Sequence, residues 1–191
     1  MDEPRLVVGI SGASGITYGV QLLRPTPVQT HLVVTKSARM TLAYETGLSV
    51  GDLTALADVS HSNTDLGAPI SSGSFRTIGM VVAPCSVKSM SEIASGVTTS
   101  LLARAADVVL KERRRLVLMV RETPLHRNHL RTMAELTELG AVIAPPVPAF
   151  YARPATLEEM VDHTVGRVLD LFDLDLGVVR RWGEAPAEVA L

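Results

Sequence analysis

The chain opens with an apolar stretch that breaks into a turn of small residues and then continues with helical periodicity. Residues 6–10 are apolar, residues 11–15 read Ser-Gly-Ala-Ser-Gly, and residues 16–23 have the spacing of a helix. Small residues let the backbone turn sharply and bring N–H groups, hydroxyls and the positive end of a helix dipole to one point. The segment therefore predicts a strand, a tight turn and a helix, with an anion site at the turn where a phosphate would fit.

The glycine spacing of this turn distinguishes between kinds of nucleotide site. It is G-x-x-G, whereas the dinucleotide fingerprint is G-x-G-x-x-G, and no Gly-Lys-Ser or Gly-Lys-Thr follows as in a P-loop. The turn therefore favours one phosphate, as on a mononucleotide, over a pyrophosphate.

Apolar segments alternate with amphipathic segments along the rest of the chain. We expect strands at residues 29–35, 77–83, 116–120 and 141–143, and helices at residues 37–45, 101–112, 126–139 and 156–171. Polar residues 58–74 predict loops around short elements. Continuously apolar strands between amphipathic helices are typical of a parallel sheet covered on both faces. We therefore predict one α/β domain over residues 1–191, a Rossmann-like or flavodoxin-like doubly wound sandwich with a mainly parallel sheet.

The composition narrows the class of partners. The chain has 191 residues, 47% of them apolar, and a formal net charge of −2, so it lacks an overall basic field and nucleic acid is a poor partner. No apolar run has the length of a bilayer span, and residues 1–5 lack the apolar core of a signal peptide, so we expect no membrane partner. A single cysteine, Cys85, excludes an intramolecular disulfide and favours the cytoplasm.

Four segments end predicted strands with residues that suit ligand binding. Ligands of doubly wound folds lie outside the carboxyl ends of the strands, where we expect residues 11–15, 84–91, 121–124 and 145–154 to converge. The second of these segments offers three serine hydroxyls and the N–H groups of a helix start, which predict a second anion site. Ordinary helix capping explains one of these serines but not all three.

Charged residues follow the same strand ends or line a helix. Arg121 suits bidentate phosphate binding, and Glu122 beside it either moves a proton as phosphate departs or merely pairs with Arg121; the spacing leaves both open. Arg104, Asp107 and Lys111 form one polar stripe on a predicted helix, and taken alone this stripe is best interpreted as a solvated face with ion pairs.

Residues 145–154 are stiffened by prolines and carry Tyr151 and Arg153 near their end. Such a loop is typical of a ligand clamp, and a turn that packs Phe150 into the core is the alternative.

Cys85, His126 and His129 are interpreted as structural. No residue in the sequence visibly lowers the pKa of Cys85, so a small core residue is favoured over a nucleophile. The two histidines stand at i,i+3, which can hold a metal, but no third ligand is evident, and we predict no metal site.

Six separated motifs occur in order along the chain: GISGASG at 9–15, ET at 45–46, APCS at 83–86, RAADVVLKER at 104–113, VRETPL at 120–125 and AFY at 149–151. Together they resemble the flavin prenyltransferase (UbiX-like) family, over residues 5–183. The resemblance implies a flavodoxin-like fold and a cytoplasmic homo-oligomer, a dodecamer, with sites at subunit interfaces. It also implies a metal-independent transfer of the dimethylallyl group from dimethylallyl phosphate to reduced FMN. The product, prenylated FMN, would serve a UbiD-like decarboxylase of phenolic acids.

The resemblance implies roles for individual residues. It places FMN against Gly12, Ala13, Ser14, Thr35, Ser86, Val87, Lys88, Ser89 and Arg121. It surrounds the prenyl phosphate with Arg104, Lys111, Arg121, Tyr151 and Arg167, and closes the site with Trp182 from a neighbouring subunit. The catalytic residues would be Ser14, Glu45, Lys111 and Glu122. Ser14 and Glu45 would handle protons near the flavin N5, and Glu122 would protonate the leaving phosphate.

Two other functions stay open. One is a flavin-dependent cysteine decarboxylase of the same fold, which needs a catalytic histidine and a Pro-Ala-Ser-Ala-Asn-Thr-type loop that residues 84–89 do not supply. The other is a non-catalytic FMN carrier, which would tolerate the loss of Lys111 and Glu122.

Overall fold

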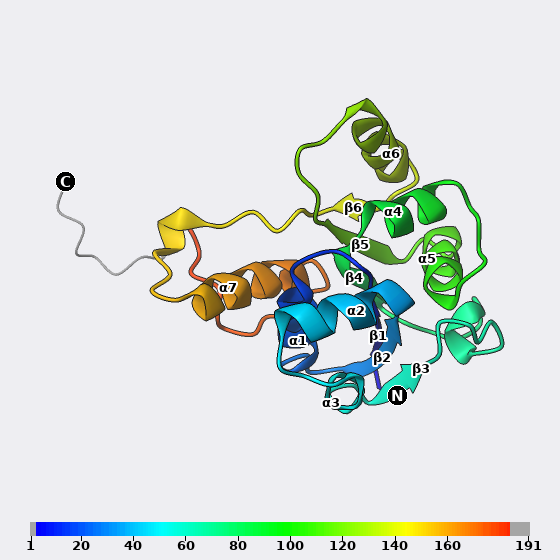
Figure 1. The fold of residues 1–191 in the computed structure, drawn as a ribbon, viewed down its shortest axis with the longest axis horizontal. Helices are drawn as coiled ribbons and strands as arrows, with labels where there is room; N and C mark the ends of the chain where they lie inside the picture. The colour runs from blue at the N-terminus through cyan, green and yellow to red at the C-terminus, as the bar shows by residue number, and fades with distance from the viewer. Residues whose placement is uncertain (1–2, 184–191) are drawn as a thin grey trace.

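Six strands form one sheet in the order β3-β2-β1-β4-β5-β6 in the computed structural model, which describes residues 3–183 (Figure 1). The strands are β1 (Arg5–Ile10), β2 (Gln29–Val34), β3 (Val59–His61), β4 (Gly79–Cys85), β5 (Arg115–Val120) and β6 (Val142–Ile143). Every strand pair in this part of the chain is parallel. This is the strand order of a doubly wound α/β fold, and the predicted fold class is confirmed.

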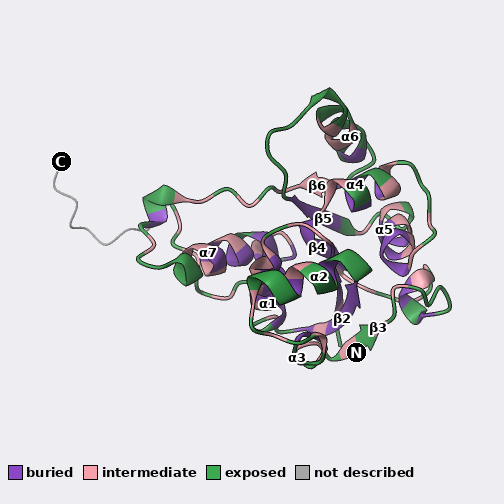
Figure 2. Cartoon of the chain, viewed as in Figure 1, coloured by how far each residue is buried: buried purple, intermediate pink, exposed green. Residues whose placement is uncertain are grey.

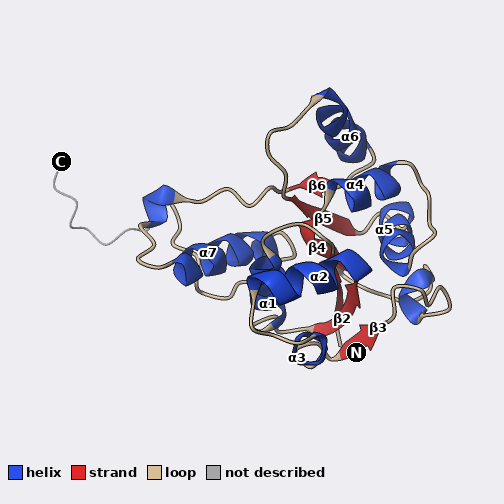
Figure 3. Ribbon diagram, viewed as in Figure 1, coloured by secondary structure: helices blue, strands red, loops and turns tan. Residues whose placement is uncertain are grey.

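Helices cover both faces of the sheet (Figure 3). They are α1 (Ile16–Leu23), α2 (Lys36–Glu45), α3 (Val50–Thr54), α4 (Val87–Ala94), α5 (Leu101–Lys111), α6 (Arg127–Glu138) and α7 (Leu157–Asp170), with 3₁₀ turns η1 (Pro69–Ser71) and η2 (Phe150–Ala152). Helix α1 packs against α2 and α7, and α4 packs against α5 and α6. No helix within residues 3–183 has the apolar length that crossing a bilayer would take.

Successive residues of each strand enter two separate cores. Leu6 and Val8 of β1 pack in the core that also contains residues of α1, α2 and α7, whereas Val7 packs in the core that contains residues of α4, α5 and α6. Because both faces of the central strands are buried (Figure 2), these strands read as unbroken apolar runs rather than alternating ones.

Side-chain caps set where several helices begin. Thr35, Ser86, Ser100 and Thr156 each accept a hydrogen bond from an amide in the first turn of α2, α4, α5 and α7. Such caps satisfy N–H groups that have no partner inside the helix. The predicted helices therefore begin at the observed residues or next to them.

The polar segment at residues 58–74 consists of loops around short elements, as predicted. It contains the short edge strand β3, which pairs with β2, and the turn η1. The sequence of β3, Val59-Ser60-His61, is too short and too polar to show a strand period. The five-residue helix α3 was missed for the same reason of length.

Candidate active site

The chain order reverses between β1 and β4, so the carboxyl ends of these strands frame the topological switch point. Ser11, which follows β1, joins them: its amide and its hydroxyl donate to the Pro84 carbonyl at 3.2 and 3.1 Å, and its hydroxyl accepts from the Ser86 amide at 2.7 Å. The Arg121 amide donates to the Cys85 carbonyl at 3.1 Å. Three of the four segments predicted to converge therefore meet here.

The N-terminus of α1 is filled by a carboxylate of the chain itself. Glu45, the last residue of α2, accepts hydrogen bonds from the Gly15 amide at 2.8 Å and the Ile16 amide at 2.9 Å. Gly15 has a φ of 96°, a conformation that favours glycine, and it presents its N–H to Glu45. The prediction that a phosphate binds these helix amides is wrong, because Glu45 already occupies them.

Ser14 and Glu45, predicted as one catalytic pair, lie together. Burial raises the pKa of Glu45, but hydrogen bonds from the Ser14 hydroxyl and from the Ile16 and Gly15 amides, with the charge of Arg121, hold that pKa below its usual range. Glu45 is therefore ionised at neutral pH, and an ionised carboxylate beside a hydroxyl can take up and return its proton.

We expect Glu45→Gln to reduce stability at pH 7 but not in acid. A carboxylate whose pKa is lowered by folding contributes stability above its ordinary pKa, and this contribution is lost as pH falls through the folded value. The urea midpoints of wild type and variant should therefore differ at pH 7 and converge below about pH 4. A difference that stays constant throughout this titration would contradict the assignment.

Unlike α1, helix α4 has no carboxylate within residues 3–183 bonded to the amides at its start. The Ser86 hydroxyl caps the helix by accepting from the Ser89 amide at 3.2 Å, and the two hydroxyls lie 3.3 Å apart. Within residues 3–183 the Val87 and Lys88 amides have no acceptor. The Lys88 ammonium pairs with Glu92 at 2.6 Å. The predicted second anion site therefore keeps the donors that such a site needs.

Ser37 lies beside Thr35 and Gly12 at the site, although the sequence did not single it out. Thr35 caps α2, and its hydroxyl lies 3.1 Å from the Ser37 hydroxyl. Gly12 lies so close to Ser37 that a Cβ at Gly12 would overlap the Ser37 side chain. Ser37 thus adds a hydroxyl beside the Gly12–Ser14 turn, and only the folded contact of this turn with α2 reveals it.

Arg121 and Glu122 are exposed at the carboxyl end of β5. Neither forms an ion pair with any residue between 3 and 183. The Glu122 carboxylate instead accepts from the Thr123 amide at 3.0 Å. Of the two alternatives for Glu122, the structure therefore excludes simple pairing with Arg121, and it leaves the Arg121 guanidinium available to a ligand.

Arg104 and Lys111 are engaged elsewhere, on α5. Arg104 pairs with Asp107 at 2.7 Å and donates to the Ser71 carbonyl at 3.1 Å, and Lys111 pairs with Glu112. The interpretation of this stripe as a helix face with ion pairs is correct for the single chain.

Lys111 and Arg121 lie at opposite ends of strand β5. Lys111 lies just before β5 and Arg121 just after it, and a six-residue strand spans about 17–20 Å. The cationic residues that the resemblance gathers around one phosphate are therefore not together within one chain.

A strap of residues 144–154, yellow in Figure 1, carries Tyr151 away from the sheet. It starts at the sheet edge, where the Ala144 amide donates to the Leu118 carbonyl at 2.9 Å, and it ends at η2 beside α7. The predicted convergence of this loop with the other three segments is therefore wrong within one chain. Phe150 is 80% exposed, so the alternative that it packs into the core is also wrong.

Tyr151, Arg167 and Trp182 form a third group around α7. The Tyr151 ring meets the Trp182 ring edge to face at 5.4 Å and the His163 ring at 5.8 Å. A pocket of about 280 Å³ opens between the strap and α7, with Tyr151 and Arg167 among mostly apolar lining residues. A small apolar group that carries an anion suits such a pocket.

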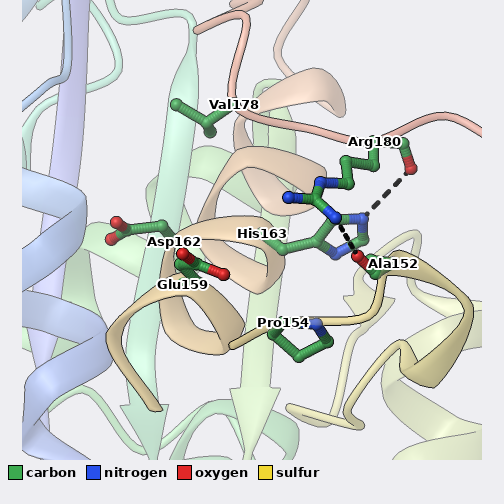
Figure 4. Close-up of a pocket in the computed structure, with 7 residues that line it drawn as sticks. All are labelled: Ala152, Pro154, Glu159, Asp162, His163, Val178 and Arg180. Atoms are coloured by element: carbon green, nitrogen blue, oxygen red, sulfur yellow. Dashed lines mark hydrogen bonds between the residues drawn. The ribbon is translucent and has the colours of Figure 1, made fainter. Parts of the chain in front are cut away.

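A second pocket of about 270 Å³ lies beside the first, between η2, α7 and the C-terminal segment (Figure 4). Two hydrogen bonds cross it: the His163 ring nitrogen Nε2 donates to the Arg180 carbonyl at 3.3 Å, and Arg180 donates to the Ala152 carbonyl at 2.8 Å. These bonds hold the C-terminal segment against α7 and η2.

Cys85 is fully buried, and burial raises the pKa of its thiol to about 12. Its interpretation as a core residue is confirmed. We expect iodoacetamide at pH 8 to leave the native protein unlabelled and to label it fully in guanidinium chloride, as mass analysis would show, because only the thiolate reacts. Rapid labelling of the native protein would contradict this burial.

His126 and His129 stack with ring centroids 3.6 Å apart at the start of α6, where His126 caps the helix by accepting from the Asn128 amide at 3.1 Å. Across residues 3–183 no three metal-ligating side chains gather at one place.

Comparisons with known proteins cover nearly the whole chain. Residues 1–169 match the Flavoprotein family. A curated relative, the flavin prenyltransferase UbiX of Thauera aromatica, is 54% identical over 190 residues, which are 97% of this chain and 98% of the relative.

Two solved structures agree with that match. A crystal structure of AnUbiX in complex with FMN and dimethylallyl pyrophosphate superimposes with a TM-score of 0.95 at 50% identity, covering 97% of this chain and 100% of that one. A dodecameric FMN-dependent UbiX-like decarboxylase from Escherichia coli O157:H7 superimposes with a TM-score of 0.91 at 49% identity, covering 93% and 98%. This chain therefore belongs to the UbiX flavin prenyltransferase family.

Proposed function

We propose that this protein transfers the dimethylallyl group of dimethylallyl phosphate to reduced FMN and delivers the prenylated flavin to a UbiD-like decarboxylase. The observation that carries the proposal is the Ser14–Glu45 pair at the switch point beside Arg121, which forms no ion pair within residues 3–183. The chain is similar over 97% of its length to a flavin prenyltransferase. AnUbiX binds FMN and dimethylallyl pyrophosphate together, which supports this pairing of substrates.

The donors at the switch point fit FMN. They are neutral N–H groups and hydroxyls with one guanidinium, a set that suits a phosphate and the polar edge of a flavin. The proposed ligands are Gly12, Ala13, Ser14, Thr35, Ser86, Val87, Lys88, Ser89 and Arg121. Reduced flavin supplies the nucleophilic carbon and nitrogen of the reaction, and the chain supplies position and charge.

The prenyl phosphate would bind with its apolar part in the pocket between the strap and α7, with Tyr151 and Arg167 on its phosphate. Breaking an allylic carbon–oxygen bond leaves a cation and a phosphate, and fixed cationic groups stabilise the charge as it develops. Arg104 and Lys111 would add these charges, and Glu122 would protonate the departing phosphate.

A site of this kind needs more than one copy of the chain. The switch point, the α5 stripe and the Tyr151 group lie apart in one protomer, and the strap and its surroundings expose large apolar side chains, among them Val147, Phe150, Leu157 and Trp182. Such exposure is typical of a protein interface. We therefore propose a homo-oligomer with sites between subunits, and a dodecamer like the similar E. coli protein. A single, buried, unpaired cysteine supports the cytoplasm as its compartment.

Anaerobic incubation with reduced FMN and dimethylallyl phosphate, followed by mass analysis of the flavin, tests the proposal. We expect the flavin to gain one five-carbon unit. A parallel reaction with dimethylallyl pyrophosphate identifies the preferred donor. Bound but unmodified FMN in both reactions would overturn the proposal and favour an FMN carrier.

A further inference from the structure

Asp170, the last residue of α7, binds two arginines at once. Its Oδ2 atom lies 2.6 Å from Nη1 of Arg167. Arg181 donates to both of its oxygens, from Nη1 to Oδ2 and from Nη2 to Oδ1, each at 3.0 Å. The Asp170 side chain is only 14% exposed, whereas Asp175, the other partner of Arg181 at 3.2 Å, is 64% exposed. Asp170 is thus the sheltered centre of this ion-pair cluster.

The bidentate bond to Arg181 holds the segment that carries Trp182. This segment follows α7, doubles back along it and packs Val179 against Gly166, where a Cβ would lie 2.6 Å from Val179 Cγ2. Trp182 comes directly after Arg181, and its ring meets Tyr151 at 5.4 Å. Without Asp170, Arg181 would keep only an exposed partner, and such pairs contribute little.

The bond to Arg167 leaves most of that guanidinium free. Arg167 has five N–H donors in a rigid plane, and its one ion pair with the described chain uses Nη1. Arg167 also lines the pocket between the strap and α7. Fixing one corner of the guanidinium orients its remaining donors, which lowers the entropy lost when they bind an anion.

We propose that Asp170 is a positioning residue that orients Arg167 toward the prenyl phosphate and, through Arg181, holds Trp182 against Tyr151. This inference rests on the proposed function for the identity of the anion. It links the pocket to the segment after α7, because one carboxylate binds both Arg167, which lines the pocket, and Arg181, which precedes Trp182.

The test compares Asp170→Asn with Asp173→Asn, a matched control that removes the same charge from an exposed neighbour which, among residues 3–183, pairs with no arginine. Trp182 is the only tryptophan of the chain, so the anisotropy of its fluorescence reports this segment directly. For Asp170→Asn we expect lower anisotropy and a KM for dimethylallyl phosphate raised about 10-fold or more, with the Kd of FMN changed less than about 2-fold. Asp173→Asn should change none of these.

A second variant separates the two roles. Arg181→Ala keeps the pair between Asp170 and Arg167, so it should lower the anisotropy as Asp170→Asn does but raise KM less. It also serves as the test if Asp170→Asn does not fold. Unchanged anisotropy and KM in Asp170→Asn, or equal changes in Asp173→Asn, would overturn the inference. If wild-type protein transfers no prenyl group, the proposed function fails, while a fall in anisotropy still supports the hold on Trp182 and its absence overturns it.

Discussion

We expect a mixed oligomer of Lys111→Ala and Glu122→Ala subunits to be active. Oligomers of either variant alone should be nearly inactive. Lys111 lies before β5 and Glu122 after it, at opposite ends of this strand. One chain therefore does not bring the two residues together. If a site takes Lys111 from one subunit and Glu122 from another, random assembly of an equal mixture leaves about a quarter of the sites with both residues. Neither variant alone has such a site.

The expected losses make this recovery easy to measure. Removing a fixed donor that stabilises developing charge costs about 10²–10³ in kcat, and removing a general acid costs about 10²–10⁴. Both variants should still bind FMN, because the proposed FMN ligands are unchanged. Turnover of co-expressed, differently tagged subunits is the measurement.

A matched mixture serves as the control. Arg104→Ala and Lys111→Ala both lie on α5, on the same side of the proposed site, so their mixture should stay inactive. Turnover in this control mixture would contradict a site shared between subunits. A lack of turnover in the mixture of Lys111→Ala and Glu122→Ala would contradict it as well. Full activity of each variant alone, with FMN still bound, would instead favour a carrier.

Gly19→Val is expected to lower the melting temperature by roughly 6–12 °C, which corresponds to about 3 kcal/mol for a chain of this size. Gly19 is where α1 crosses β4: a Cβ there would overlap the Ala83 carbonyl oxygen and lie 2.7 Å from Ile10 Cδ1. Backbone atoms cannot move aside as a flexible side chain can, so α1 must shift away from the sheet.

The shift should also weaken FMN binding, because α1 begins at the Gly12–Ser14 turn. Thermal unfolding and the Kd of FMN are the two measurements. Gly47→Val is the matched control, since nothing lies within 4 Å of a Cβ at Gly47. Equal melting temperatures of the two variants would show that the contact of α1 with β4 is not as tight as described.

The fold could be predicted because its signals are local. The central strands are apolar on both faces, and hydroxyl caps mark helix starts such as those of α5 and α7. A three-residue edge strand such as β3 has no such signal, since it buries little and pairs on one side only.

The site could be predicted only in part, because several of its contacts join residues distant in sequence. Ser14 and Arg121 stand in recognisable motifs, but Glu45 reaches Gly15 across 30 residues, and no local pattern reveals that its carboxylate fills the helix end. The separation of Lys111 from Arg121, by contrast, already follows from the predicted strand at residues 116–120, which lies between them.

The carboxylate of Glu45 at the start of α1 also makes the two helix ends of the switch point unequal. One end is already neutralised and would repel a second negative charge, whereas the start of α4 keeps its amides unbonded within residues 3–183. We therefore expect an elongated ligand with a single charged terminus to bind with that terminus at the start of α4. The polarity of binding is thereby built into the protein before any ligand arrives.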